Sequence, residues 1–142
     1  MSLLELQQNP AAFRAALLID TDAGPKPFSE VVDPWQATDF AALDDGWRRA
    51  VFGKDATAKY QRGWLERSRG HSKSADLGVM ASWALFASRR PISGIAAAGD
   101  QDQARLLRDA IAKLTHFNPW LAKLLEVQNT RITNKHTGST LD

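Results

Sequence analysis

Residues 67–74 carry the strongest functional signal in this chain of 142 residues. They read Arg67-Ser68-Arg69-Gly70-His71-Ser72-Lys73-Ser74. The closing Lys-Ser pair fits the phosphate-binding pattern G-x-x-x-x-G-K-[ST], but both glycine positions depart from it. Arg67 stands at the first glycine position, and Ser72 stands directly before the lysine. The pattern alone is therefore weak, and the flanking segments have to support or refute it.

The flanking segments predict an α/β fold. Residues 60–66, YQRGWLE, are short and aromatic and predict a strand, and residues 73–88 predict a helix with one apolar side. The remainder predicts, in order, a strand, a helix capped by Asp100, a short helical turn and a strand (residues 91–98, 100–118, 120–125 and 127–133). This order is typical of a parallel sheet with right-handed crossovers. Ligands bind such sheets at the carboxyl ends of the strands, which is where residues 67–74 would lie.

The first third of the chain has a different character. Residues 2–18 predict a helix that Pro10 splits or kinks, residues 21–27 a turn-rich connector, and residues 37–51 a second helix. We therefore divide the chain into an N-terminal helical segment and a P-loop-like core (residues 1–58 and 59–142). The first segment holds five Lys/Arg against nine Asp/Glu and the second holds thirteen against seven. This asymmetry is compatible with an anionic ligand for the second segment, but on charge alone an ordinary solvated surface is the simpler interpretation.

The composition excludes several classes of protein. Hydrophobic residues make up 44% and charged residues 24%, which is typical of a globular domain and not of a disordered or fibrous chain. The absence of cysteine excludes disulfide frameworks, thiolate zinc sites and cysteine nucleophiles. The longest nearly apolar run, residues 77–87, is about half of what a bilayer span needs. The N-terminus has no basic region of the signal-peptide type.

The loop nevertheless has the chemistry that phosphate binding requires. Backbone N–H groups at a helix N-terminus, with the positive end of the helix dipole behind them, bind phosphate oxygens whatever the side chains are. Lys73 supplies a mobile ammonium for the β- and γ-phosphates, and the Ser74 hydroxyl can ligate Mg²⁺. Arg69 adds a planar guanidinium that can reach a γ-phosphate. From the pattern alone, a solvated basic loop that caps a helix explains the same residues equally well.

The sequence resembles the large terminase subunits of tailed bacteriophages, the ATPases that drive DNA into the prohead. The segment SRGHSKS, residues 68–74, is similar to their phosphate loops, in which an arginine precedes the Gly/His/Lys-Ser cluster. Residues 33–40, DPWQATDF, resemble the upstream adenine-recognition segment of that family. Residues 92–104 resemble its second strand and the following helix start, and residues 127–142 its next hairpin. The joint order of these segments carries the resemblance, which covers nearly the whole chain.

The resemblance implies an ATP- and Mg²⁺-dependent DNA-packaging motor with a P-loop fold. It implies that Arg69 and Lys73 act in catalysis and that Ser74 ligates Mg²⁺. It also implies the nucleotide-binding set Trp35, Gln36, Ser68, Arg69, Gly70, His71, Ser72, Lys73 and Ser74. The partners in the family are double-stranded viral DNA, the terminase small subunit and the portal, without a membrane, in the cytoplasm of the bacterial host.

Gln36 and Trp35 each allow an interpretation that does not depend on the resemblance. The Gln36 amide offers one donor and one acceptor group, which suits the N6 and N7 edge of adenine. Trp35 can stack on a base, or it can anchor the start of a helix in the core. The other tryptophans are expected to be packing residues (Trp47, Trp64, Trp83 and Trp120).

The carboxylates that such an ATPase uses to hold Mg²⁺ and activate water are not evident after the loop. Two segments have part of the expected pattern of apolar residues followed by carboxylates, but both precede the loop (residues 17–20, LLID, and 43–45, LDD). We therefore expect an N-terminal fragment, without Walker B strand or nuclease domain, that binds ATP but turns it over poorly. Its incomplete sheet would invite self-association. Two alternatives stay open: a prophage remnant that binds DNA or another motor subunit without hydrolysis, and a fragment of another P-loop NTPase such as a helicase.

Overall fold

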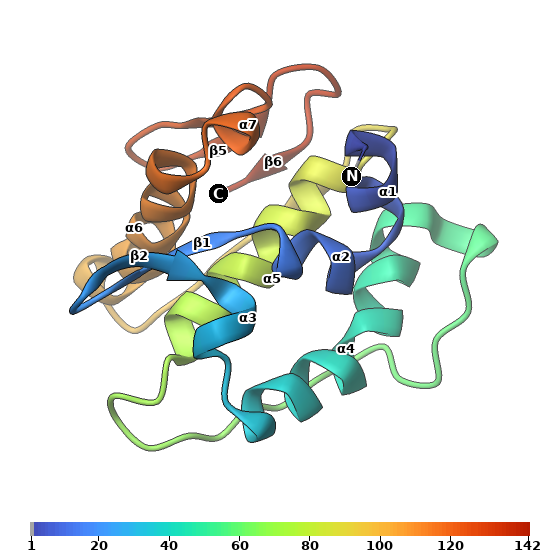
Figure 1. Cartoon of the computed structure of the whole chain (residues 1–142). Helices are drawn as coiled ribbons and strands as arrows, with labels where there is room; N and C mark the ends of the chain where they lie inside the picture. The colour runs from blue at the N-terminus through green and yellow to red at the C-terminus, as the bar shows by residue number, and fades with distance from the viewer. Residues whose placement is uncertain (1) are drawn as a thin grey trace.

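A computed structural model describes residues 2–142 and has a mixed α/β architecture in which helices predominate (Figure 1). The first part contains α1 (Leu3–Gln8), α2 (Pro10–Ala15), β1 (Leu18–Thr21), β2 (Gly24–Pro27), α3 (Phe28–Val31), α4 (Pro34–Phe52) and the 3₁₀ helix η1 (Gly53–Asp55). The second part contains α5 (Lys73–Ala87), β3 (Ser93–Gly94), α6 (Gln101–Phe117), α7 (Pro119–Ala122), β4 (Leu125–Val127), β5 (Ile132–Asn134) and β6 (Thr140–Leu141).

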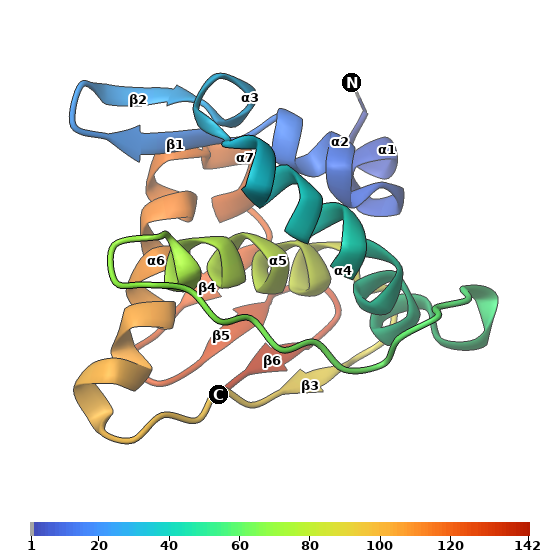
Figure 2. The same ribbon diagram turned by 90° about the horizontal axis from the view of Figure 1, so that it is seen from below.

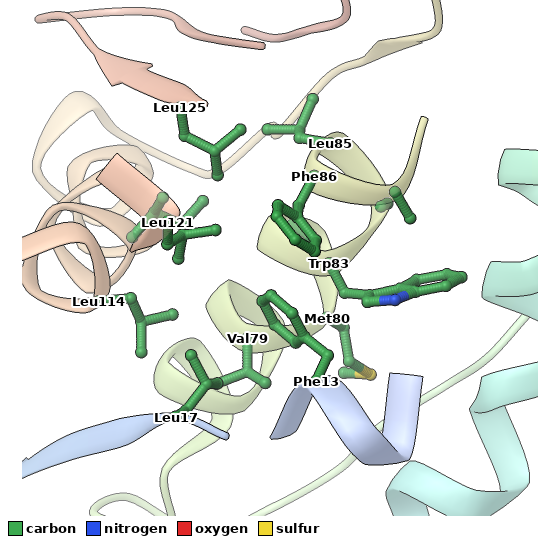
Figure 3. Packing of buried hydrophobic residues seen from close by; sticks show 14 of the residues in the cluster. Phe13, Leu17, Val79, Met80, Trp83, Leu85, Phe86, Leu114, Leu121 and Leu125 are labelled. Atoms are coloured by element: carbon green, nitrogen blue, oxygen red, sulfur yellow. The ribbon is translucent and has the colours of Figure 1, made fainter. Parts of the chain in front are cut away.

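Helix α5 lies at the centre of the core, between α4 and α6 (Figure 2). Every residue from position 78 to 87 is buried, so the helix is covered on all sides and not only along the one apolar side that the sequence predicts. The Trp83 side chain is 1% exposed, and its indole N–H donates to the carbonyl oxygen of Leu6 at 3.0 Å. Figure 3 shows that side chains from both parts of the chain pack around this helix (Phe13, Leu17, Leu114, Leu121 and Leu125). This packing fixes the helix that follows the phosphate-loop candidate.

The main sheet is mixed, so the expectation of a parallel sheet is wrong for most of it. Its strand order is β3-β6-β5-β4, and only β3 and β6 run parallel. Strands β4 and β5 form an antiparallel hairpin where one strand was expected over residues 127–133. The turn between them is closed by a hydrogen bond from the Gln128 N–H to the Arg131 carbonyl, and so short a connection can only reverse the chain. The strand expected over residues 91–98 is reduced to β3.

Residues 60–66 do not form the expected strand. They run in an irregular extended path along α4 and α5 (Figure 2), and no ladder partner for them occurs among residues 2–142. Trp64 was expected in the core but is 89% exposed, whereas Trp47 and Trp120 do pack against the core. An aromatic segment with no adjacent strand edge has nothing with which to pair its backbone, and this is the physical reason for the error.

The helix predictions are largely confirmed. Pro10 does split the N-terminal helix, since Asn9 ends α1 and caps α2 with its side chain. The Asp100 side chain caps α6 by accepting from the Gln103 N–H at 2.8 Å. The connector expected over residues 21–27 is instead part of a hairpin in which β1 pairs with β2. Gly24, at φ 96°, supplies the left-handed backbone that this tight reversal requires.

Candidate functional site

The backbone of residues 70–75 is shaped like an anion-binding loop. Gly70 has φ 77° and Ser72 has φ 58°, and Ser72 is the single non-glycine residue with positive φ in the part of the chain that the structure describes. A left-handed backbone costs a non-glycine residue about 1–2 kcal/mol, and such strain is concentrated at functional sites. Ser72 is the N-cap of α5, but its hydroxyl does not cap the helix.

The first turn of α5 therefore keeps its donors available. The N–H groups of Lys73, Ser74 and Ala75 have no hydrogen-bond acceptor among residues 2–142, and the first bonded N–H is that of Asp76, to the Ser72 carbonyl at 2.8 Å. The 15 residues of α5 place a full helix dipole behind these three donors. Unbonded N–H groups at the positive end of a buried helix suit an anion.

Two exposed basic side chains belong to the same loop and first helical turn. Lys73 and Arg69 are exposed, and neither forms an ion pair within residues 2–142. The Ser74 side chain is half-buried at the second position of α5. Ser68 and His71 are exposed, and the Nδ1 atom of His71 lies 3.0 Å from the Arg69 carbonyl oxygen. The loop can thus offer three N–H donors, two mobile cations and one hydroxyl to a single anion.

Arg67 is buried at the start of this loop. Its side chain is 7% exposed, and its guanidinium donates to Asp76 at 2.6 Å and to Asp39 at 2.8 Å. Burial acts to lower the pKa of Arg67, but the hydrogen bonds and negative charges of the two carboxylates outweigh it and raise that pKa. The guanidinium also donates to the His71 carbonyl at 3.2 Å. Arg67 is therefore a permanently charged link between α4, α5 and the loop.

Trp35 and Gln36, expected on sequence grounds to lie on the adenine side, meet this loop through Arg67 and Asp76. The Gln36 amide nitrogen donates to both Asp76 carboxylate oxygens, at 3.0 and 3.1 Å, and its oxygen accepts from the Asp33 N–H at 2.9 Å. The Trp35 ring, 39% exposed, lies 4.7 Å from the Arg67 Cζ atom and 6.0 Å from the His71 ring. Two segments more than thirty residues apart thus form one site. Gln36 already uses its amide within the protein.

A groove of about 680 Å³ opens beside the first turn of α5. Gln36, Ser72, Ala75 and Asp76 line it on the side of α4 and α5. Apolar side chains in and directly after α3 and on α5 and α6 line much of the rest (Val31, Val32, Val79, Leu106 and Phe117). Lys113 and four carboxylates also line it (Asp20, Asp22, Asp33 and Asp109). This volume falls in the range of small-molecule and cofactor sites.

The sequence did not reveal the carboxylates that organise this site. Asp39 lies 28 residues before Arg67, and Asp76 lies nine residues after it, so no local spacing connects them. The one available signal was an arginine at a position where the phosphate-binding pattern has glycine. Among residues 2–142 no three His, Asp or Glu side chains gather closely enough to hold a metal ion.

Comparison with known proteins does not assign this chain to a family. The chain matches no family model, and neither curated proteins nor solved structures give a match. Within the described residues, no helix has both the length and the apolar character that a membrane crossing needs. The assignment of function therefore depends on the residues themselves.

Proposed function

We propose that residues 67–74 bind the phosphates of ATP and that the chain is the nucleotide-binding part of a DNA-packaging ATPase of the terminase large-subunit type. One observation carries the proposal: three unbonded N–H groups, of Lys73, Ser74 and Ala75, sit at the N-terminus of a buried 15-residue helix behind two residues of positive φ. The resemblance of the sequence segments to terminase large subunits supplies the class of motor.

The donors and cations have complementary tasks in this proposal. The three N–H groups and the helix dipole hold one phosphate, and this contact is made by the backbone and needs no particular side chain. Lys73 reaches outward from the same turn and neutralises a second phosphate. Arg69 approaches from the loop and stabilises charge that builds on the terminal phosphate, because a guanidinium presents a fork that matches phosphate oxygens.

The residues also fit a magnesium ion and a nucleoside. Ser74 stands one residue after the lysine, where its hydroxyl would hold Mg²⁺, and the bound ion would neutralise charge on the phosphate oxygens. The groove beside Gln36 and Ser72 is large enough for a base and ribose. The Trp35 ring is 39% exposed next to His71, and a base would stack on the ring face that Arg67 does not cover.

The same geometry predicts binding without appreciable turnover. The two carboxylates that are joined to the loop through Arg67, Asp39 and Asp76, are both held by that arginine, and Asp76 is also bound by Gln36. Neither is free to orient an attacking water. Loss of one such transition-state group commonly costs on the order of 10²–10⁴ in rate. A phosphate-release assay on the purified chain is therefore expected to stay at background.

The test is the equilibrium affinity for ATP·Mg²⁺, measured by calorimetry on the parent chain, Lys73→Ala and Lys123→Ala. Lys123 is exposed at the end of α7 and serves as the matched control. We expect Lys73→Ala to lose at least tenfold in affinity, about 1.4 kcal/mol, because removing a cation from a phosphate contact costs about 1.5–3 kcal/mol. Lys123→Ala should bind like the parent. Equal affinity in all three proteins would overturn the proposal.

A second candidate function, nucleic-acid binding, is favoured by a cluster of cations at the other end of α4. The Arg48 and Arg89 Cζ atoms lie 5.6 and 5.5 Å from the centroid of the Phe52 ring, and neither guanidinium has an ion-pair partner within residues 2–142. Two arginines that lie against one half-buried aromatic ring and have no carboxylate partner among the described residues suit a phosphate backbone. If DNA binds there, its affinity should fall steeply with salt, and Arg89→Ala should reduce the log-log slope by about one.

A further inference from the structure

Arg67 joins α4 and α5 near the loop, next to the hydrogen bonds that Gln36 of α4 donates to Asp76 of α5. Its Nη2 atom donates to Asp39 of α4, and its Nη1 atom donates to Asp76 of α5. The same Nη1 atom also donates to the carbonyl of His71, four residues further along the chain. One guanidinium therefore contacts α4, α5 and the His71 end of the loop at the same time.

The charges in this link affect the electrostatic environment of an anion at the start of α5. Asp39 and Asp76 place two negative charges near the first turn of α5, and Arg67 offsets one of them. Arg67 also has an unfavourable effect on stability, because its Nε atom is buried without an acceptor among residues 2–142. Native proteins rarely leave a buried donor unpaired, and where they do the arrangement calls for an explanation. A link that orders a functional loop provides one.

We infer that Arg67 is a positioning residue: held by Asp39 and Asp76, it fixes the loop of residues 68–72 so that the N–H groups of α5 and Lys73 meet the phosphates together. Arg67 itself does not touch the nucleotide. Its two bonds to the carboxylates occupy the ends of its guanidinium, which face α4 and α5. The inference rests on the proposed function, since it names what holds that same site in shape.

The direction in which one substitution changes the affinity for ATP·Mg²⁺ distinguishes a positioning role from a purely electrostatic one. Asp39→Asn removes a negative charge near the phosphate site, so electrostatics alone would strengthen the binding of ATP·Mg²⁺. If Asp39 instead holds Arg67 in place, the same change loosens the loop and weakens binding. The Asp39 side chain is 36% exposed, so the variant is expected to fold. Asp45→Asn, an exposed carboxylate on the same helix, makes the same charge change away from Arg67 and is the control.

The experiment measures three quantities on the parent, Asp39→Asn, Asp39→Glu and Asp45→Asn. Calorimetry gives the affinity for ATP·Mg²⁺, NMR relaxation gives the order parameters of the backbone amides of residues 68–72, and hydrogen exchange gives the protection of the amides of α5. We expect Asp39→Asn to bind about two- to tenfold more weakly, the range for loss of one half-exposed charged hydrogen bond. The order parameters of the loop amides should fall, whereas hydrogen exchange in α5 should stay as in the parent. Asp39→Glu, which keeps the charge, should recover part of the affinity.

Each other outcome is decisive. If Asp39→Asn binds as tightly as the parent, or more tightly, the positioning role is wrong while the phosphate site stands. If its affinity falls but exchange accelerates throughout α5, the residue supports only the fold, and the inference is again wrong. If the parent chain does not bind ATP·Mg²⁺, the proposed function fails first, and the inference falls with it.

Discussion

Replacing Asp76 by alanine should destabilise the whole chain, because two buried partners lose their acceptor at once. The Asp76 side chain is 4% exposed and accepts from Arg67 at 2.6 Å and from the Gln36 amide at 3.0 and 3.1 Å. In the variant the Gln36 amide nitrogen keeps no acceptor, and Arg67 keeps only Asp39 and the His71 carbonyl. A buried charge and a buried amide are then left underbonded.

The expected loss of stability follows from these contacts. Breaking a buried ion pair by removing one partner costs about 3–5 kcal/mol. Because Arg67 retains the half-exposed Asp39, we expect the lower end, about 3 kcal/mol. For a chain of this size each kcal/mol lowers the melting temperature by about 2–4 °C, so the expected decrease is about 6–12 °C.

Thermal and urea unfolding followed by far-UV circular dichroism measures this decrease. Asp45→Ala removes an exposed carboxylate from α4 and should change stability by less than about 0.5 kcal/mol. The double variant Arg67→Met/Asp76→Leu should be more stable than Asp76→Ala alone, since it removes the buried charge together with its partner. A change below about 1 kcal/mol for Asp76→Ala, or a double variant that is the least stable of all, would refute this reasoning.

Three further predictions concern the loop and the helix behind it. Ser72→Gly should raise stability by about 0.5–1 kcal/mol in urea unfolding without weakening ATP·Mg²⁺ binding, because glycine adopts the left-handed backbone without strain; a loss of stability would contradict it. Gly78→Val should cost about 1–3 kcal/mol in the same assay, because a Cβ atom at Gly78 lies 3.1 Å from the Ala110 Cβ atom and overpacks α5 against α6. Ser74→Ala should weaken ATP binding in the presence of Mg²⁺ and leave Mg²⁺-free binding unchanged; an equal loss under both conditions would exclude the hydroxyl as a metal ligand.

Much of the helical framework was predictable because its signals are local. Asp100 before an apolar repeat marks the start of α6, and Pro10 after Asn9 marks the break between α1 and α2. The position of the loop at the start of α5 was predictable for the same reason, since Lys73 opens an apolar run. Local capping and periodicity are strong enough here to survive the tertiary context.

The sheet and the link at Arg67 were not predictable from local signals. The β4–β5 hairpin occupies a single alternating segment, and Asn129, inside the turn that the Gln128–Arg131 hydrogen bond closes, is the one local signal of its reversal. Trp64 is of a residue type that is common in strands, but no partner strand lies beside it in the described part of the chain, so it remains exposed. Asp39, Arg67 and Asp76 meet only after α4 packs against α5, and their spacing along the chain carries no pattern. Tertiary packing decides all three.

The phosphate assignment is best tested by an NMR titration of the backbone amides with ATP·Mg²⁺ and with inorganic pyrophosphate. If the N-terminus of α5 binds phosphate, the amides of Lys73, Ser74 and Ala75 should show the largest shifts with both ligands, and Lys73→Ala should reduce them strongly. Amides of residues 73–75 that stay unmoved, while those near Arg48 and Arg89 shift, would contradict the assignment and favour the cation cluster at the other end of α4.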